Sequence, residues 1–530
     1  MANQLNDPAQ LCFENVRTRR LIIASYWVVV LLAIPLWWKT TSIERLSLPT
    51  SRVHAQRSKE LYFPVNVNVG TLNADDDVPV VKAVAAALQQ DSVQLTGGGV
   101  DVRMRTGVSS DAAYRVVFDQ GLHESVVDGR ELHVPMDIAT THEGVVQDLK
   151  SILERLLAPY GSPASSAQTQ RVMKYSPRYR LAFTLLNEDA ASGNAAMAWE
   201  VQGAIEGHIG PLLKKLSDLH NFTIESQVQF HAPLAFEPRP VQHEGRDVHG
   251  LTHEDLTVFI NSAEWTLSSS VSNDPVIHFV LFIPSARNSP LHIIDQQGSI
   301  HPSNAFLLPQ WGGIVLLNPS QEAPIPRLTT TDLSPVFNTF AHQLLTLLGV
   351  PGLPPHIRAV ARPDSLAQRE PFTDWELDAL LRRRALENVQ SSTETLEAIV
   401  RLVDQIENMP VGEDVVGDIQ DALDALNEAH EASSSSPVET LKHSARALTL
   451  ASRAFFNPGM LALLYFPAEH TYAVYTPLFA SVAAPLIGAV IREVVAWRKA
   501  RKAAAAAAAP KSQGQSQENV HAEGANKKAD

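Results

Sequence analysis

Cysteine is almost absent from this sequence, because Cys12 is the only one among 530 residues. An intramolecular disulfide is therefore excluded, and a chain entering an oxidising compartment would have to be held by packing alone. The sequence also lacks a G-x-S-x-G nucleophile elbow, an H-E-x-x-H zinc motif, a C-x-x-C pair, a P-loop and a G-x-G-x-x-G dinucleotide fingerprint. No motif therefore predicts a catalytic residue, a cofactor or a metal.

Charge is absent from two long stretches, residues 21–38 and residues 472–491. An α-helix needs about 20 apolar residues to cross roughly 30 Å of hydrocarbon. A cleaved signal peptide is the alternative for the first stretch, but this stretch is longer than a typical signal core and no small-residue cleavage site follows it. A buried core helix is the alternative for the second, but Pro477, Pro485 and Gly488 are typical of membrane spans. We predict two transmembrane helices, at 21–38 and 472–491.

Basic residues flank both spans on the side of the chain termini. Three arginines lie between residues 17 and 20, and five basic residues lie between 492 and 502, whereas residues 457–471 contain no Lys or Arg. The positive-inside rule then places both termini in the cytosol. This predicts a cytosolic tail at 1–20, a translocated region at 39–471, and a C-terminal tail at 492–530 that is first basic and then disordered.

The region between the tails is acidic. It carries 32 basic and 51 acidic residues, a net charge near −19. Such a surface repels the phosphate backbone, so we expect no nucleic-acid partner.

Helix and strand patterns alternate through the first part of the central region. Apolar residues at helical spacing predict helices at residues 78–89, 144–157, 195–216 and 335–348. Apolar runs predict strands at residues 100–108, 114–118, 131–134, 179–186, 222–230, 276–283 and 313–317. A Ser/Ala/Gln stretch at 161–170 predicts a linker. The pattern indicates two α/β lobes, 39–160 and 171–350, in which helices cover sheets.

A helical pattern follows the proline-rich segment at residues 350–363. Thr373 and Glu376 form a capping box, which satisfies free backbone N–H groups where a helix begins. We predict four amphipathic helices, the first ending near residue 389 and the others with apolar stripes at 396–406, 415–426 and 438–455. They form an antiparallel bundle at 372–456 rather than a coiled coil, because the stripe is not a strict heptad. The predicted fold class is a membrane-anchored mixed α/β domain with a C-terminal helical bundle and two transmembrane helices.

A histidine-rich segment at residues 241–256 is the nearest approach to a metal site. It contains His243, Glu244, His249 and His253. These spacings do not bring ligands to one helical face, and the local pattern is typical of a loop. We predict a solvated loop and no metal ligands.

Asn221 begins Asn-Phe-Thr, the one N-x-[ST] sequence in the chain without proline. The predicted topology places it on the translocated side of the membrane, where such a tripeptide can receive an N-glycan. We therefore predict glycosylation of Asn221.

Six segments carry a resemblance to a known family. They are IPLWWKTTSIERLSLP at 34–49, KYSPRYRLAFTLLNED at 174–189, HNFTIESQVQF at 220–230, FINSAEWTL at 259–267, PQWGGIVLLN at 309–318 and AFFNPGMLALLYFPAEHTYAVYTPLF at 454–479. In this order they resemble the signature segments of the PIG-S subunit family of the GPI transamidase complex. The histidine-rich segment and the alanine-rich tail depart from the family pattern.

The resemblance implies a non-catalytic subunit in the endoplasmic reticulum membrane, with a large luminal domain and both termini cytosolic. It also implies three partners: other transamidase subunits including a separate catalytic chain, proproteins with a GPI-attachment signal, and membrane lipid. The family pattern carries no catalytic residue and no cofactor. The alternative is a membrane-anchored luminal hydrolase whose active site is assembled from dispersed residues or from the histidine-rich segment.

Overall fold

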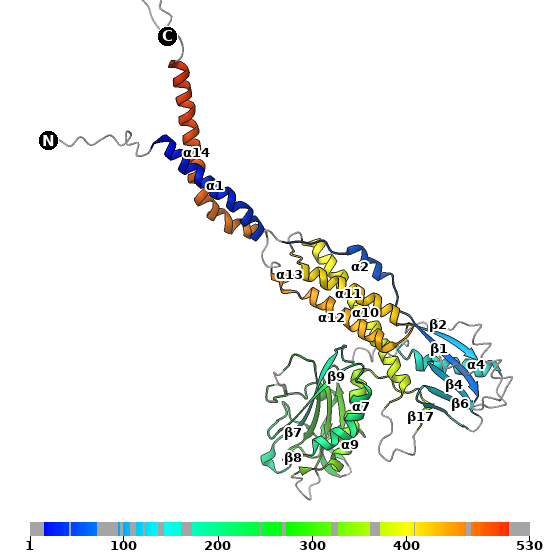
Figure 1. The fold of residues 1–530 in the computed structure, drawn as a ribbon. Coiled ribbons are helices and arrows are strands. Elements are labelled where there is room, and N and C mark those ends of the chain that lie inside the picture. Colours follow the sequence, from blue (N-terminus) through cyan, green and yellow to red (C-terminus); the bar gives the residue numbers. More distant parts are fainter. Residues whose placement is uncertain are drawn as a thin grey trace, which may run out of the picture. The chain divides into compact units, whose positions relative to one another are not determined.

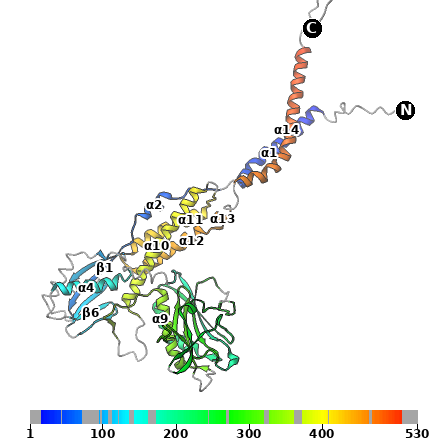
Figure 2. The same cartoon turned by 180° about the vertical axis from the view of Figure 1, so that it is seen from behind.

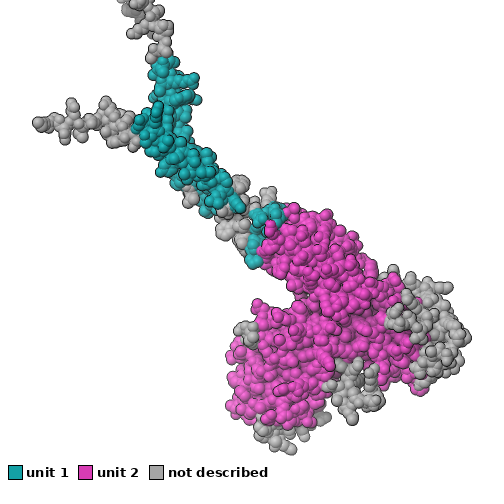
Figure 3. All heavy atoms as spheres, in the orientation of Figure 1, with its two compact units in different colours: residues 1–46, 406–412, 458–530 teal, residues 47–405, 413–457 magenta. Residues whose placement is uncertain are grey.

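The chain forms two compact units, coloured separately in Figure 3. The first unit comprises residues 1–46, 406–412 and 458–530, and the second comprises residues 47–405 and 413–457. The computed structural model describes residues 15–41, 44–71, 94–95, 99–106, 113–119, 122–135, 142–160, 172–243, 245–261, 263–267, 272–319, 327–360, 372–406, 409–462 and 468–507. The predicted helix at 78–89 and the predicted linker at 161–170 lie outside these residues.

Two long apolar helices dominate the first unit. They are α1 (Val16–Thr41) and α14 (Ala468–Ala507), and the short helix α13 (Pro458–Ala462) precedes α14. Both are long and apolar enough to cross a membrane, with mean hydropathies of 1.9 and 1.7 over their most apolar parts. They lie side by side in Figures 1 and 2. The two predicted spans are thus confirmed as helices suited to a membrane.

The contacts between α1 and α14 differ at the two ends of the pair. At one end Arg19 and Arg20 both bond to Glu493, at 2.7 and 2.6 Å. At the other end Trp37 packs edge-on against Phe479, with ring centroids 4.9 Å apart, and against Tyr475. Ion pairs at one end and aromatic rings at the other suit the two membrane–water boundaries.

Disorder is predicted for the tail from Ala503 onward, and this is wrong for residues 503–507, because α14 continues through the basic stretch to Ala507. Alanine, lysine and arginine have high helix propensities, so the basic stretch and its alanines extend the helix that the span begins. Residues 508–530 lie outside the described part of the chain.

The first lobe of the second unit is built on a seven-stranded sheet with the order β17-β5-β6-β4-β1-β3-β2. Helix α4 (His142–Leu157) packs on it through Leu149, Leu153 and Leu156. The prediction missed β1, although its valines alternate with polar residues and are buried. The strands are β1 (Phe63–Thr71), β2 (Gln94–Leu95), β3 (Val100–Thr106), β4 (Tyr114–Asp119), β5 (Ser125–Asp128), β6 (Glu131–Pro135) and β17 (Ile357–Ala359).

The second lobe is built on a five-stranded sheet with the order β14-β15-β12-β7-β9, in which only β14 is antiparallel. Helix α9 (Thr330–Leu348) covers one face, where Phe337 stacks on Phe183 with centroids 5.4 Å apart. Phe259 and Trp265 pack against the other face. Burial on both faces explains why β7 and β12 are nearly continuous apolar runs. The strands are β7 (Arg178–Asn187), β9 (Asn221–Gln229), β12 (Val276–Ile283), β14 (Ala305–Leu308) and β15 (Gly312–Leu316).

The predicted continuous helix at 195–216 is wrong in its first part. Residues Ala198–Trp199 form a short strand, β8, which pairs with β16 (Arg327–Leu328). The helix then begins as α6 (Val201–Ala204) and continues through a π-helical turn, η3 (Ile205–Ile209), into α7 (Gly210–Lys215). Backbone pairing with a distant segment thus replaces the first turn that local periodicity predicts.

Two adjacent glycines of β15 make close contacts that no other residue type could make. A Cβ built on Gly312 would lie 1.9 Å from the carbonyl oxygen of His278, and one built on Gly313 would lie 2.0 Å from Oε1 of Gln343. The Gln343 side chain is 7% exposed, and its Nε2 donates to the carbonyl of Phe306, 2.9 Å away. The glycines therefore let α9 and β12 approach β15 closely.

We expect Gly313→Ala to destabilise the second unit by about 1–3 kcal/mol, because the added methyl overpacks the site and displaces Gln343 from its hydrogen bond. Denaturant unfolding of the purified chain measures this. Gly417→Ala is the matched control, since a Cβ added there would have nothing within 4 Å and the residue is in helix α11 (Glu413–Ala432), where alanine is favoured. Equal stability of the two variants would contradict the expectation.

The helical region contains fewer and longer helices than predicted. The first two predicted helices are one, α10 (Asp374–Gln405), followed by α11 and α12 (Pro437–Phe455). The polar stretch inside α10 does not end it. Ser392 and Thr393 donate to carbonyls four residues earlier, at 2.6 and 2.9 Å, so their hydroxyls do not compete for the backbone N–H groups of the helix. A further helix, α2 (Thr50–Arg57), packs on the bundle, where Gln56 donates to Asn427.

Candidate functional site: a buried arginine junction on helix α10

Three consecutive arginines near the start of α10 connect this helix to both lobes. The predicted capping box is confirmed, since Thr373 Oγ1 and its backbone N–H both bond to Glu376 Oε2, at 2.8 and 2.6 Å. At about 100° per residue, Arg382 and Arg384 project roughly 200° apart, so they face opposite sides of the helix. We call the set Asp378, Arg382, Arg383, Arg384 and Glu387 the arginine junction.

The first-lobe side of the junction is a buried network around Tyr114. Asp378 accepts hydrogen bonds from the Tyr114 hydroxyl at 2.7 Å and from both Nε and Nη2 of Arg130, at 2.8 and 3.0 Å. Arg382 donates to the Tyr114 hydroxyl at 3.0 Å and to the carbonyl of Leu157 at 3.2 Å. Asp378 and Arg382 are 3% and 2% exposed. Burial raises the pKa of Tyr114, which therefore stays a neutral donor.

Trp375, about two turns before Arg382 on α10, belongs to the core of the first lobe. Its ring is fully buried and lies 4.2 Å from that of Tyr114, centroid to centroid. It joins a cluster that includes Val116 of β4 and Leu153 of α4. The start of α10 is thus part of the hydrophobic core of the first lobe as well as of its polar network.

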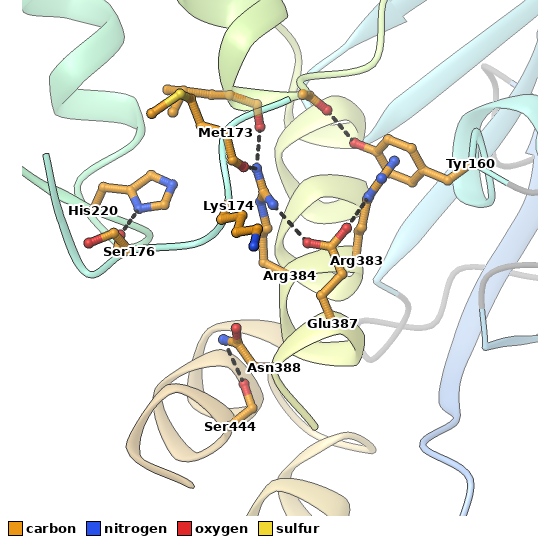
Figure 4. Close-up of polar contacts among 12 residues, drawn as sticks. Tyr160, Met173, Lys174, Ser176, His220, Arg383, Arg384, Glu387, Asn388 and Ser444 are labelled. Carbon is orange, nitrogen blue, oxygen red and sulfur yellow. Dashed lines mark hydrogen bonds and ion pairs between the residues drawn. The ribbon is translucent and has the colours of Figure 1, made fainter. Parts of the chain in front are cut away.

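The second-lobe side of the junction is centred on Arg384, shown in Figure 4. Its Nη2 donates to the carbonyls of Met173 and Leu348, at 3.0 and 2.9 Å, and its Nη1 donates to Glu387 Oε2 at 2.7 Å. Leu348 is the last residue of α9, where backbone carbonyls lack partners within the helix and the helix dipole is negative. A buried guanidinium is suited to that end of α9, because it satisfies the carbonyls and the dipole together.

Arg383 and Glu387 complete the junction beside Tyr160. Arg383 Nε donates to Glu387 Oε1 at 2.7 Å, and its guanidinium lies 4.1 Å from the centre of the Tyr160 ring. The Tyr160 hydroxyl donates to the carbonyl of Gly349, 2.8 Å away (Figure 4). Burial alone would raise the pKa of Glu387, but Arg384 and Arg383 outweigh it and hold the pKa below its usual range. Glu387 therefore stays ionised between two cations.

The polar groups of the junction bond to one another and to the lobes, an arrangement that suits structural support better than acid–base catalysis. Each of its carboxylates accepts hydrogen bonds from arginine, and Arg382 and Arg384 each also bond to a backbone carbonyl of a lobe. A carboxylate saturated by arginines is a poor general base, and arginine stays protonated in proteins. The same buried charges lose much of their solvation, so each depends on its partners for its stability.

A buried histidine lies near the junction in the second lobe. His220 Nδ1 donates to the carbonyl of Ser176, 2.6 Å away (Figure 4), and Nε2 is buried without a hydrogen-bond partner. The rings of Tyr175 and Tyr179 surround it, at 5.4 and 4.9 Å. Burial lowers the pKa of His220 to about 4, so the imidazole is neutral at pH 7.

We expect the second unit to lose stability as the pH falls from about 6.5 to 4. In that window the unfolded chain takes up a proton on His220 that the folded state, with its lower pKa, does not. A shift of this size corresponds to about 3 kcal/mol. The denaturant midpoint should fall less steeply with decreasing pH in His220→Phe than in the wild type. An unchanged pH profile in that variant would contradict a buried neutral His220.

The histidine-rich segment is not a loop, so that prediction is wrong. Residues on both sides of the turn form a hairpin of β10 (Arg239–His243) and β11 (Arg246–Leu251), followed by α8 (His253–Thr257). Pro240 pairs with His249 and Val241 with Val248, which puts His243 and His249 on opposite faces of the hairpin. Glu244 lies outside the described residues. No group of three potential metal ligands occurs within the described part of the chain.

Asn221 is the first residue of β9, the edge strand of the second lobe opposite β14. Its side chain is exposed, and its backbone N–H donates to the carbonyl of Pro177, 2.9 Å away. Thr223, the third residue of the acceptor sequence, is also exposed. The position is accessible, and occupancy by a glycan stays a prediction.

The arginine junction was not predicted from the sequence. The available signal was LRRRALEN at 381–388, three arginines inside an otherwise apolar helical pattern. Arginines on an amphipathic helix usually face solvent, so only the contacts of α10 with two lobes identify them as buried.

These features define a class of protein: a membrane protein with two apolar helices and an extramembrane part in which a long helix joins two α/β lobes. The chain belongs to the family described as phosphatidylinositol-glycan biosynthesis class S protein, whose family model matches residues 24–500. It is 30% identical to "GPI-anchor transamidase component PIGS" of Bos taurus, over 92% of this chain and 97% of the relative. It is 29% identical to the protein of the same name in Homo sapiens, over 92% and 98%. It is 29% identical to "GPI transamidase component PIG-S homolog" of Schizosaccharomyces pombe, over 96% and 88%.

Proposed function

We propose that this chain is a non-catalytic component of the GPI transamidase complex, which supports assembly and the presentation of proproteins for GPI attachment. The observation that carries the proposal is the match, over almost the whole chain, to proteins named as components of that transamidase. The geometry agrees with a structural role, because the buried charges of the arginine junction are used to join α10 to the lobes.

The partners we propose are the other transamidase subunits, including a separate catalytic chain, proproteins with an attachment signal, and membrane lipid. The proposed location is the endoplasmic reticulum membrane, with the second unit luminal and both termini cytosolic. Support comes from the arginines at the N-terminal end of α1 and the basic residues after the apolar part of α14, which both belong on the cytosolic side.

Rescue of a cell line that lacks this chain tests the proposal. Full-length protein should restore surface display of a GPI-anchored reporter. The triple variant His243→Ala, His249→Ala, His253→Ala should restore it equally, because the register already separates two of these histidines. Loss of display in the triple variant, at normal abundance and with the complex assembled, would show that the chain contributes chemistry.

We predict that Asn221 carries an N-glycan, because the proposed topology places this exposed acceptor in the lumen. Endoglycosidase treatment should increase the electrophoretic mobility of the wild type and leave that of Asn221→Gln unchanged. Thr223→Ala is a second variant that should abolish the shift, whereas Thr223→Ser should keep it. Absence of a shift in the wild type would count against glycosylation at this site.

A further inference from the structure

The end of α14 presents a strongly basic surface. Between Arg492 and Ala507 it carries five basic residues and one acidic residue, Glu493. Glu493 is already bonded by Arg19 and Arg20, so it does not neutralise the others. All five basic residues are exposed, and we call them the basic arc: Arg492, Arg498, Lys499, Arg501 and Lys502.

The basic arc lies on one side of α14. At about 100° per residue its five positions cover roughly half of the helix circumference, and Glu493, which faces α1, lies on the other half. Exposed apolar side chains lie within and beside the arc. At the same angular spacing Val494 and Val495 project within it, and Trp497 projects beside Arg501, whose guanidinium lies 5.4 Å from the centre of the Trp497 ring. A basic surface interspersed with valine and flanked by tryptophan is suited to a membrane–water boundary.

The direction of the side chains brings the arc toward the bilayer. In an α-helix each Cα–Cβ bond tilts toward the N-terminus, which for α14 is the direction of its apolar segment. Lys502 lies roughly 16 Å beyond Ile491 at 1.5 Å per residue, and the headgroup layer accounts for about 5–7 Å of that distance. Long basic side chains that lean back shorten this distance, so the nearer ones reach the phosphate level and the farther ones come within a Debye length of it.

We propose that the basic arc of α14 binds anionic phospholipid headgroups of the adjacent leaflet. The identity of that leaflet as cytosolic rests on the proposed function and topology. Charge complementarity selects the ligand, because four or more basic residues directly after a membrane span attract anionic lipid within a Debye length of about 8 Å. The arc recognises negative charge rather than one headgroup shape, since it is a convex helix surface and not a pocket.

Trp497 allows the proposal to be tested in the full-length chain. The protein is placed in nanodiscs of phosphatidylcholine that contain a minor fraction of phosphatidylserine. One sample contains brominated phosphatidylserine, and the other contains brominated phosphatidylcholine at the same mole fraction. The difference between wild type and Trp497→Phe isolates the fluorescence of Trp497. We expect brominated phosphatidylserine to quench this fluorescence more than brominated phosphatidylcholine, with the anionic lipid enriched on the order of tenfold. The preference should weaken as salt is added.

Two variants complete the test. Replacing Arg498, Lys499, Arg501 and Lys502 with glutamine should remove the preference for phosphatidylserine, whereas Arg498→Lys with Arg501→Lys should retain it. Phosphatidylinositol in place of phosphatidylserine should give the same preference, because both are anionic. Equal quenching by the two brominated lipids in the wild type would overturn the proposal and make an acidic protein segment the better ligand. Both leaflets have one composition, so the result depends neither on topology nor on transamidase subunits.

Discussion

Arg384→Ala is expected to lower the free energy of unfolding of the second unit by about 3–5 kcal/mol, the range for breaking a buried ion pair. The variant removes the donor to the carbonyls of Met173 and Leu348 and one of the two cations that bond to Glu387. The Arg384 side chain is 3% exposed, so water does not readily replace these bonds. Denaturant unfolding of the purified full-length chain measures the loss.

Arg383→Ala is the matched control for this substitution. Arg383 is the same residue type on the same helix and also bonds to Glu387, but its side chain is 13% exposed and stacks on Tyr160. We expect a loss of about 1 kcal/mol from the cation–π contact. Arg384→Lys should fall between the two alanine variants, because an ammonium cannot reproduce the planar fork. A loss below about 1 kcal/mol in Arg384→Ala would contradict the role given to this residue.

Asp378→Ala is the second substitution expected to have a large effect, again about 3–5 kcal/mol. It removes the acceptor of Tyr114 and Arg130 and takes the negative charge out of the network that also holds Arg382, which is 2% exposed and bonds to the same Tyr114 hydroxyl. Asp374→Ala is the control, because the Asp374 side chain is 37% exposed and water can partly replace its ion pair with Lys215, so the expected loss is about 1 kcal/mol.

A double variant separates the buried charge from simple loss of packing. Arg382→Met in the Asp378→Ala background removes the uncompensated cation, so it should recover part of the stability that Asp378→Ala loses. Two results would show that the network around Tyr114 is not coupled as the contacts indicate. One is a loss in Asp378→Ala no larger than that in Asp374→Ala. The other is a loss in the double variant equal to the sum of the losses in Asp378→Ala and in Arg382→Met measured alone.

The parts of the fold that were predicted correctly have strong local signals. The Thr373–Glu376 capping box and the apolar runs of β7 and β12 depend on neighbouring residues only, and both are found in the structure. The helix α9 was predicted from residue 335 but begins at Thr330, where a second capping box, Thr329 with Asp332, starts it. Short-range sequence patterns of this kind can be identified without knowledge of tertiary contacts.

Three of the misses have a common physical cause, which is that distant contacts override local periodicity. The strand β8 forms because β16 pairs with it. The paired residues Ala198 and Arg327 are 129 residues apart in the chain. The histidine-rich hairpin is held in a sheet by β13 (Leu291–Ile293), which pairs with β11. The arginine junction depends in the same way on carbonyls at Leu157, Met173 and Leu348, which no pattern near residue 382 could indicate.

Affinity purification of the full-length chain in mild detergent, followed by identification and quantification of the co-purifying chains, tests the central claim most directly. We predict that the other GPI transamidase subunits, the catalytic one included, are recovered in constant proportion. We also predict that Arg384→Ala lowers their recovery, whereas the triple histidine variant does not. Recovery of the wild-type chain alone, with GPI attachment unaffected by its removal from cells, would contradict a role in transamidase assembly.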